Sequence, residues 1–480
     1  MAFSLNIENF GKLANATINI GNLTILAGPN NTGKSYVSKL LYSLVDAMNA
    51  DHFSLHLSGL IAPIGAGLSN LRIMIDDSDE QLYFHGYHSD LSILNRHLRK
   101  MRKIAESRPV DGTDYEEDLS AIREAYSLIR HTAREMRQDY SRVKPAIAQD
   151  PKHTLENLQE RSASNLRYVV EILSRIETNI ENLCNMTEST DAYSFVIGGI
   201  RRKIRQNLTR NFQELRLSAL IQKGMETSKI NIEGRGELQI QKNSIQPQIT
   251  PAELLMWQQY SGAIYLESPL YWKLQNVTRR RRLPFFRSGR SRMGDFPGYF
   301  YDLLYNINEE FHGEIDFPGI LENLIDNIGG KLILSEDGDL LFLENDHKFT
   351  MPLAATGVIN LGILALSIER KVLNKGTFLF IDEPEAHLHP AWQVVMAETL
   401  FELAQKGVNV VIATHSADIL KWIEEWVKAN PGDQKFIALN QFSANGVVAE
   451  DDDFETRLAN IKGELTKPFA DLYLGGLPKR

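Results

Sequence analysis

One short motif limits what this chain can fold into more than any other feature. GPNNTGKS, from Gly28 to Ser35, fits the pattern G-x-x-x-x-G-K-[ST] without departure, and it stands between an apolar, β-branched stretch and a segment with helical apolar spacing. Glycines permit backbone angles that turn N–H groups onto phosphate oxygens, and the following helix directs its positive end at the same charge. We expect Lys34 to reach the β- and γ-phosphates of a nucleotide and the Ser35 hydroxyl to bind Mg²⁺. The residues expected to contact the nucleotide are Gly28, Pro29, Asn30, Asn31, Thr32, Gly33, Lys34, Ser35 and Tyr36.

A second apolar run ends in two acids. TFLFI is followed by Asp382 and Glu383, and a carboxylate at the carboxyl end of a sheet strand can hold Mg²⁺ directly or through water. The adjacent Glu383 can orient the attacking water or accept its proton. Two acids after a strand would alone indicate only a solvated strand end. Together with the phosphate loop, they predict a metal ligand at Asp382 and a catalytic residue at Glu383.

Three histidines lie near these strand ends. VNVVIAT leads into His415, which can donate a hydrogen bond to a γ-phosphate; the alternative is a helix-capping histidine. His387 and His389 follow Glu383 without further residues at metal-ligand spacing, so we interpret them as loop residues that shape the turn and not as zinc ligands.

The chain alternates between two kinds of pattern. Residues 1–50 read as β then α, residues 51–228 as helical, and residues 229–480 as β hairpins followed by alternating strands and helices. The predicted fold class is therefore α/β, with a mixed or parallel sheet, flanking helices, an antiparallel β lobe and an inserted helical, coiled-coil-like domain. The two ends of the chain are expected to form one domain.

Three apolar spines with alternating steps of three and four residues characterise the helical segment, and they predict short helical hairpins. The spines are Leu91, Leu94, Leu98, Met101 and Ala105; Leu119, Ile122, Tyr126, Ile129, Ala133 and Met136; and Leu166, Val169, Leu173, Ile176, Ile180 and Leu183.

Composition excludes several classes of protein. The formal net charge of −9 argues against a uniformly basic nucleic-acid coat protein, and 43% hydrophobic residues suffice for two or three cores. A lone cysteine, Cys184, excludes a disulfide framework and Cys-based metal centres. There is neither a signal-peptide pattern nor an apolar run long enough for a membrane span, so we expect a cytoplasmic protein without a membrane partner.

The order of phosphate loop, helical insertion, IDEPEAHLHP and ATHS resembles the ABC-type ATPase heads of the Rad50, SMC, RecF and OLD group. The segment EPEAHLHP is most similar to OLD-like ATPases of bacterial phage defence, such as the ATPase subunits of the PARIS and Septu type. The resemblance implies ATP and Mg²⁺ as cofactors. It also implies a homodimer whose heads sandwich two ATP molecules, with Thr356 and Gly357 in the roles of the family's Ser-Gly pair against the partner's ATP; Thr356 departs from the family's serine but keeps the hydroxyl.

We therefore expect an ATP-hydrolysing sensor or scaffold subunit of a defence complex that holds a separate effector, a nuclease or a toxin. The residues after Ser416 contain no second carboxylate strand, so no nuclease site is expected in this chain. Two alternatives remain. One is a DNA-repair or recombination ATPase that contacts DNA through the basic run Arg279–Arg292, and the other is a nucleotide-stabilised assembly with little turnover. Phe10 and Lys12 are candidates for the adenine pocket by their place in the sequence alone.

Overall fold

The computed structural model divides the chain into two compact units. One contains residues 1–49 and 201–480, and the other contains residues 50–200. The structure describes residues 2–50, 52–76, 92–99, 120–132, 134–135, 138, 171–172, 174–182, 192–273, 296–309, 313–335, 339–443 and 453–475. The predicted fold class, α/β with a parallel sheet, antiparallel β sheets and an inserted helical unit, is confirmed.

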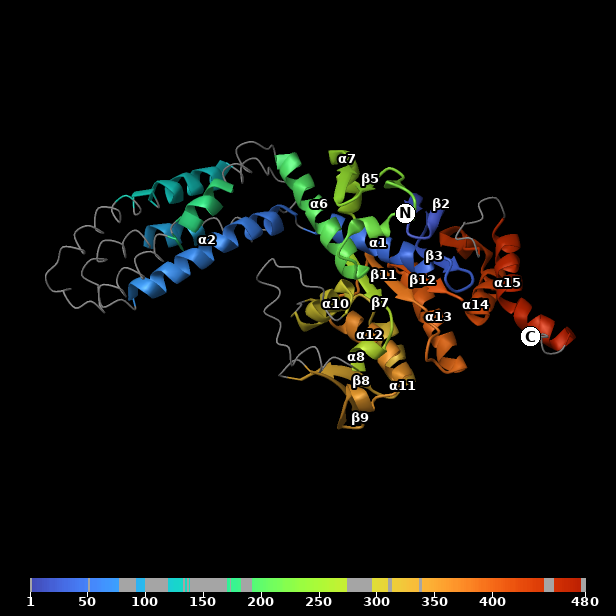
Figure 1. Ribbon diagram of the computed structural model, residues 1–480. Coiled ribbons are helices and arrows are strands. Elements are labelled where there is room, and N and C mark those ends of the chain that lie inside the picture. Colours follow the sequence, from blue (N-terminus) through green and yellow to red (C-terminus); the bar gives the residue numbers. More distant parts are fainter. Residues whose placement is uncertain are drawn as a thin grey trace. The chain divides into compact units, whose positions relative to one another are not determined.

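A five-stranded parallel sheet forms the centre of the first unit, with strand order β13-β3-β12-β11-β7. Strand β3 from the start of the chain lies beside β12 and β13 from its end (Figure 1). Strands β3, β11 and β12 are almost wholly buried, as expected for a parallel sheet covered on both faces. The bounds are β3 Leu23–Ala27, β7 Gly262–Leu266, β11 Thr377–Asp382, β12 Asn409–Thr414 and β13 Ile437–Gln441.

Two antiparallel sheets complete the β structure. The larger has strand order β2-β1-β4-β5-β6, and its strands β4 and β5 form a hairpin around Gly234 and Gly236. The smaller has strand order β10-β9-β8, and residues 336–338, between β8 and β9, lie outside the described residues. The bounds are β1 Phe3–Phe10, β2 Leu13–Ile20, β4 Thr227–Ile232, β5 Gly236–Gln241, β6 Ser244–Gln248, β8 Lys331–Leu334, β9 Leu340–Glu344 and β10 His347–Thr350.

Helices connect the parallel strands, and their ends follow local signals. Helix α14 begins after Ser416, whose hydroxyl accepts a hydrogen bond from the Ile419 amide, and α13 begins with Pro390 at its first position. The α-helices of the first unit are α1 Lys34–Asn49, α7 Pro251–Trp257, α8 Leu270–Lys273, α10 Gly298–Asn308, α11 Pro318–Ile328, α12 Thr356–Glu369, α13 Pro390–Gln405, α14 Ala417–Ala429 and α15 Phe454–Gly475. The 3₁₀ helices are η2 Leu217–Leu220, η4 Met351–Leu353 and η5 Pro431–Phe436.

Helix α6, Ala192–Asn211, has residues in both units. Residues 201–228, which the sequence pattern placed in the helical segment, group with the first unit because polar contacts join the end of α6 to α1. Asn207 donates to the Ser43 carbonyl and to Asp46, both at 2.9 Å, and Lys203 lies 3.0 Å from Asp46. These contacts are buried or partly buried, so they fix this part of α6 against α1.

The second unit is helical wherever it is described, with α2 at His52–Asp76. The described spine positions are helical and buried: Leu94, Leu98, Ile122, Tyr126, Ile129, Ile176 and Ile180. The other predicted spine positions lie outside the described residues. A coiled coil therefore stays a prediction. None of the described helices combines the length and apolar character that crossing a membrane requires.

Two glycines of α2 allow a matched test of this packing. A Cβ at Gly67 would lie 2.6 Å from Ile176 Cγ1, an inner atom of a buried β-branched side chain, whereas a Cβ at Gly59 would meet nothing within 4 Å. Glycine-to-alanine replacement in a helix otherwise stabilises by about 1 kcal/mol. We expect Gly59→Ala to raise the melting temperature of the helical unit and Gly67→Ala to lower it, measured by circular dichroism. Equal shifts in the two variants would contradict the described packing.

Candidate active site

The phosphate loop lies between β3 and α1, and its two glycines adopt backbone conformations that other residues rarely adopt. Gly28 has φ +152° and Gly33 has φ +107°. A Cβ at Gly28 would lie 2.2 Å from the Phe442 carbonyl oxygen, and one at Gly33 would lie 2.9 Å from a Leu13 methyl carbon. Close packing and backbone angle therefore both require glycine at these positions.

Lys34 is buried within this loop. Its ammonium donates to the carbonyl oxygens of Gly28 and Pro29, at 2.9 and 2.7 Å. Burial lowers the pKa of Lys34, and carboxylates at the end of β11 and directly after it oppose the shift. These carboxylates are Asp382, Glu383 and Glu385. The structure thus brings the lysine together with both predicted acids and with a third.

The other loop residues support this arrangement. The Thr32 hydroxyl donates to the Pro29 carbonyl at 2.9 Å. Asn31 has φ +68° and accepts a hydrogen bond from Lys12, so Lys12 braces the loop. Asn30 is exposed beside it.

Two aromatic residues near the loop belong to the protein interior. Phe10 is fully buried in contact with the rings of Tyr36 and Phe212, at 6.2 and 5.7 Å between centroids. The suggestion that Phe10 contributes to an adenine pocket is therefore wrong, because its ring is already packed on both neighbours. Tyr36, expected near the nucleotide, is half-buried in this cluster.

The predicted magnesium ligands lie next to each other. The Tyr265 hydroxyl lies 3.5 Å from Asp382 Oδ2. Burial raises the pKa of Asp382 to about 6, the neighbouring Ser35 hydroxyl opposes the shift, and the nearby Glu267 adds to it. A hydroxyl and a buried carboxylate are the hard oxygen donors that Mg²⁺ prefers, so these two residues fit the ion.

Glu383 and His415 also meet. Glu383 has φ +55°, and its side chain is 48% exposed. One of its carboxylate oxygens lies 3.4 Å from His415 Nδ1. A carboxylate and an imidazole therefore face each other beside Lys34 and Asp382, which is an arrangement able to accept and to donate protons.

Two acids in this region were missed at the sequence level. Glu385, the second glutamate of the EPE triplet, is buried, with its Oε1 atom 3.6 Å from His415 Nδ1. Glu267 follows β7 directly, so the signal that identified Asp382, an acid after an apolar strand, was present for Glu267 as well.

Glu267 lies in a network of donors. Lys39 lies 2.9 Å from one of its carboxylate oxygens, and Tyr271 and Tyr299 donate to the other. Burial raises the pKa of Tyr299, and the neighbouring Glu267 strengthens the shift, so the phenol keeps its proton and donates. Glu267 is thereby held next to α1, where its partner Lys39 lies one helical turn after Ser35.

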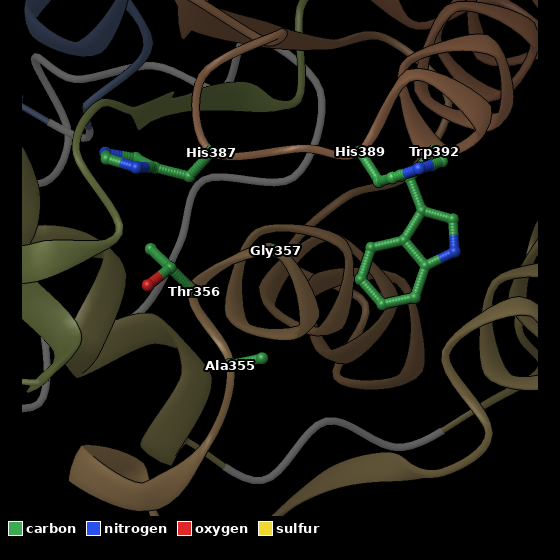
Figure 2. A pocket seen from close by; sticks show the side chains of 6 residues that line it. All are labelled: Ala355, Thr356, Gly357, His387, His389 and Trp392. Atoms are coloured by element: carbon green, nitrogen blue, oxygen red, sulfur yellow. The ribbon is translucent and has the colours of Figure 1, made fainter.

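Thr356 and Gly357 lie in a separate hollow at the start of α12. They line a pocket of about 470 Å³ together with Ala355, His387, His389 and Trp392. In Figure 2, Thr356 and His387 lie on one side of the pocket, and Trp392 lies on the other. A Cβ at Gly357 would lie 3.1 Å from both the His387 carbonyl oxygen and the Trp392 ring, so glycine keeps this hollow open.

The two histidines after Glu383 have local roles in this hollow. His389 caps α13 by accepting a hydrogen bond from the Ala391 amide at 3.3 Å, and His387 has φ +62° in the preceding turn. Within the described part of the chain, no group of three or more His, Cys, Asp or Glu residues is arranged to hold a metal ion.

Several known proteins and structures share limited similarity with this chain. A 44-residue stretch is 48% identical to the Old nuclease of Escherichia phage P2, covering 9% of this chain and only 8% of that protein. Among solved structures, the Smc head domain with a coiled coil and joint from Pyrococcus yayanosii is 12% identical, with a TM-score of 0.32, covering 97% of this chain and 99% of that chain. The Smc head domain with an extended coiled coil from Pyrococcus furiosus, bound to the C-terminal domain of ScpA, is 11% identical, with a TM-score of 0.29 and coverage of 96% and 99%. An ATP-binding cassette of an ABC transporter is 17% identical, with a TM-score of 0.24 and coverage of 50% and 77%.

Two family models match the segments that build the site. Residues 222–421 match "AAA domain, putative AbiEii toxin, Type IV TA system", and residues 1–83 match "AAA ATPase domain". The first segment contains Asp382 and His415, and the second contains the phosphate loop. Both distant parts of the chain that meet at the site are therefore similar to ATPase domains described as AAA.

Proposed function

We propose that the chain binds ATP with Mg²⁺ and hydrolyses it. The single observation that carries the proposal is the meeting of two distant segments at one edge of the sheet, where the buried Lys34 of the phosphate loop lies near Asp382 and Glu383 at the end of β11. These residues are distant in sequence and are of the types that together hold a metal–triphosphate. Glu383 and His415, 3.4 Å apart, supply the remaining functional groups.

Each residue has a distinct part in the proposed reaction. Lys34 balances charge on the β- and γ-phosphates. Ser35 and Asp382 would hold Mg²⁺, which would supply positive charge next to the transferred group. Glu383 orients the attacking water and accepts its proton. His415 donates a hydrogen bond to the γ-phosphate and so distinguishes ATP from ADP.

We further propose that two copies enclose ATP between them. Thr356 and Gly357 at the start of α12 would then contact the nucleotide held by the partner, and their open pocket supports this role. The contacts between α1, which starts at the phosphate loop, and α6, which has residues in both units, offer a route from nucleotide state to the helical unit.

The cellular role we propose is that of a sensor or scaffold in an anti-phage defence complex that holds and releases a separate effector. Three observations support this role: the segment EPEAHLHP, the match to the family model described as a putative AbiEii toxin, and the short match to Old nuclease. Co-purification with the product of a neighbouring gene, and reduced phage plating by the pair, are the expected results. Plating that is unchanged by the pair would overturn this role.

A DNA-repair ATPase and a nucleotide-stabilised assembly remain the alternatives. The basic run Arg279–Arg292, on which DNA contact would depend, lies outside the described residues. DNA-stimulated ATP turnover at low salt would favour the repair ATPase, and ATP binding without turnover would favour the assembly.

Hydrolysis is tested by two substitutions and a control. We expect Glu383→Gln to lower kcat by about 100-fold or more while ATP binding persists, because the residue acts on water and not on ATP. The ATP-loaded variant should also accumulate as a dimer in light scattering.

Lys34→Ala should weaken ATP binding at least about ten-fold, since it removes the buried ammonium. Glu402→Gln changes an exposed glutamate on α13 and should leave turnover unchanged. Unchanged turnover in Glu383→Gln would contradict the assignment.

The magnesium site has a signature in stability. Burial raises the pKa of Asp382 from about 3.8 to about 6, so without Mg²⁺ the folded chain is penalised for an ionised group that the unfolded chain solvates. The penalty grows between about pH 4 and 6, is constant above pH 6, and amounts to roughly 3 kcal/mol.

In EDTA at pH 7.5, Asp382→Asn removes this penalty and should therefore raise the melting temperature by a few degrees. The gain should disappear near pH 4, and only the unaltered chain should be stabilised by Mg²⁺. A lower melting temperature for the variant in EDTA would contradict this.

A further inference from the structure

Of the three carboxylates near Lys34, only Glu385 has no part in the proposed reaction. It is 9% exposed, whereas Glu383, two residues earlier, has a side chain that is 48% exposed. Burial of a carboxylate is unfavourable unless hydrogen bonds or opposite charge compensate. The surroundings of Glu385 therefore indicate what it does.

Glu385 holds the segment that follows β12. Its Oε1 atom accepts hydrogen bonds from the Thr414 hydroxyl at 2.8 Å and from the His415 backbone amide at 3.2 Å. Thr414 is fully buried, and its hydroxyl accepts in turn from the Ser416 amide at 3.0 Å. One carboxylate thus fixes three consecutive residues at the junction of β12 and α14.

The imidazole of His415 lies against the same carboxylate. Its Nδ1 atom lies 3.6 Å from Glu385 Oε1 and 3.4 Å from Glu383 Oε1. His415 Nδ1 and Glu385 Oε2 are both buried, and neither has a hydrogen-bond partner. A short rotation of the ring towards Glu385 would supply an acceptor for Nδ1–H. Pairing of this nitrogen with a carboxylate leaves Nε2 for a ligand.

We propose that Glu385 is a positioning residue for His415. It holds the backbone and the Nδ1 side of the ring, so that Nε2 is presented to the γ-phosphate. The inference rests on the proposed function, and Glu385 itself touches neither the nucleotide nor the attacking water. A purely structural role would stabilise the chain without selective dependence on His415.

The test is a double-mutant cycle between Glu385 and His415. Glu385→Gln keeps the side-chain volume and one acceptor oxygen but removes the charge. We expect about a ten-fold loss of kcat together with weaker binding of ATP but not of ADP, because His415 contacts only the γ-phosphate. In a His415→Ala background, Glu385→Gln should change kcat by less than about two-fold. Equal losses in both backgrounds, or no loss in either, would overturn the proposal.

A second variant and a nucleotide-binding measurement test the same proposal independently of Glu385→Gln turnover. Thr414→Val removes the hydroxyl that contacts Glu385, so it should reproduce the loss of kcat even if Glu385→Gln folds poorly; Glu402→Gln is the matched surface control. Fluorescent ATPγS and ADP analogues measure the preference for the triphosphate. This preference should fall in Glu385→Gln only when His415 is present, and a preference that stays unchanged would overturn the proposal. If the unaltered chain binds ATPγS but does not turn over ATP, hydrolysis fails as the proposed function, and the nucleotide preference still decides the role of Glu385.

Discussion

Strand β12 pairs with β3 on one side and with β11 on the other, and the site depends on these two parallel pairings. Thr414 lies opposite Ala27, and Ala413 lies opposite Asp382. Because the strands run in the same direction, their carboxyl ends meet at one edge of the sheet. The phosphate loop, the acids after β11 and His415 each begin where a strand stops, so their proximity follows from backbone register. The side chains of Lys34, Glu383 and His415 need to span only the short distance between neighbouring strand ends.

The same edge concentrates negative charge. Acids after β7 and β11 lie around Lys34 and Lys39, and one of them, Asp382, has a pKa raised to about 6 mainly by burial. Burial of like charges is unfavourable to folding, and proteins retain such arrangements at functional sites. A divalent cation bound to Ser35 and Asp382 would relieve part of this cost. The charge distribution and the donor atoms thus favour the same occupant.

Sequence reasoning succeeded where the signal was local. The strands before Gly28, Asp382 and His415 are continuous apolar runs, and the polar residues that end them are adjacent in the chain, so parallel pairing was enough to predict that they meet. It was less successful where tertiary packing decides. The burial of Glu385 depends on Thr414, 29 residues away, and Phe10 is an interior residue because Phe212 and Tyr36 cover it. The extent of the helical insertion also could not be read from periodicity, since residues 201–211 are helical like the insertion but pack on α1.

The position of β3 between β12 and β13 has a consequence for how the protein is made. Residues 23–27 are synthesised long before their two neighbours in the sheet, which are residues 409–414 and 437–441. At about 5–20 residues per second, roughly 20–80 seconds of translation separate the synthesis of β3 from that of β13. Throughout that interval the apolar strand has two open edges, which is the condition under which nascent chains aggregate. Residues 50–200 form a compact unit from contiguous sequence and can fold during this wait, whereas the nucleotide pocket can form only after β11 and β12 have been made. The apolar residues of β3 therefore remain without their sheet neighbours until both of these later strands have been made.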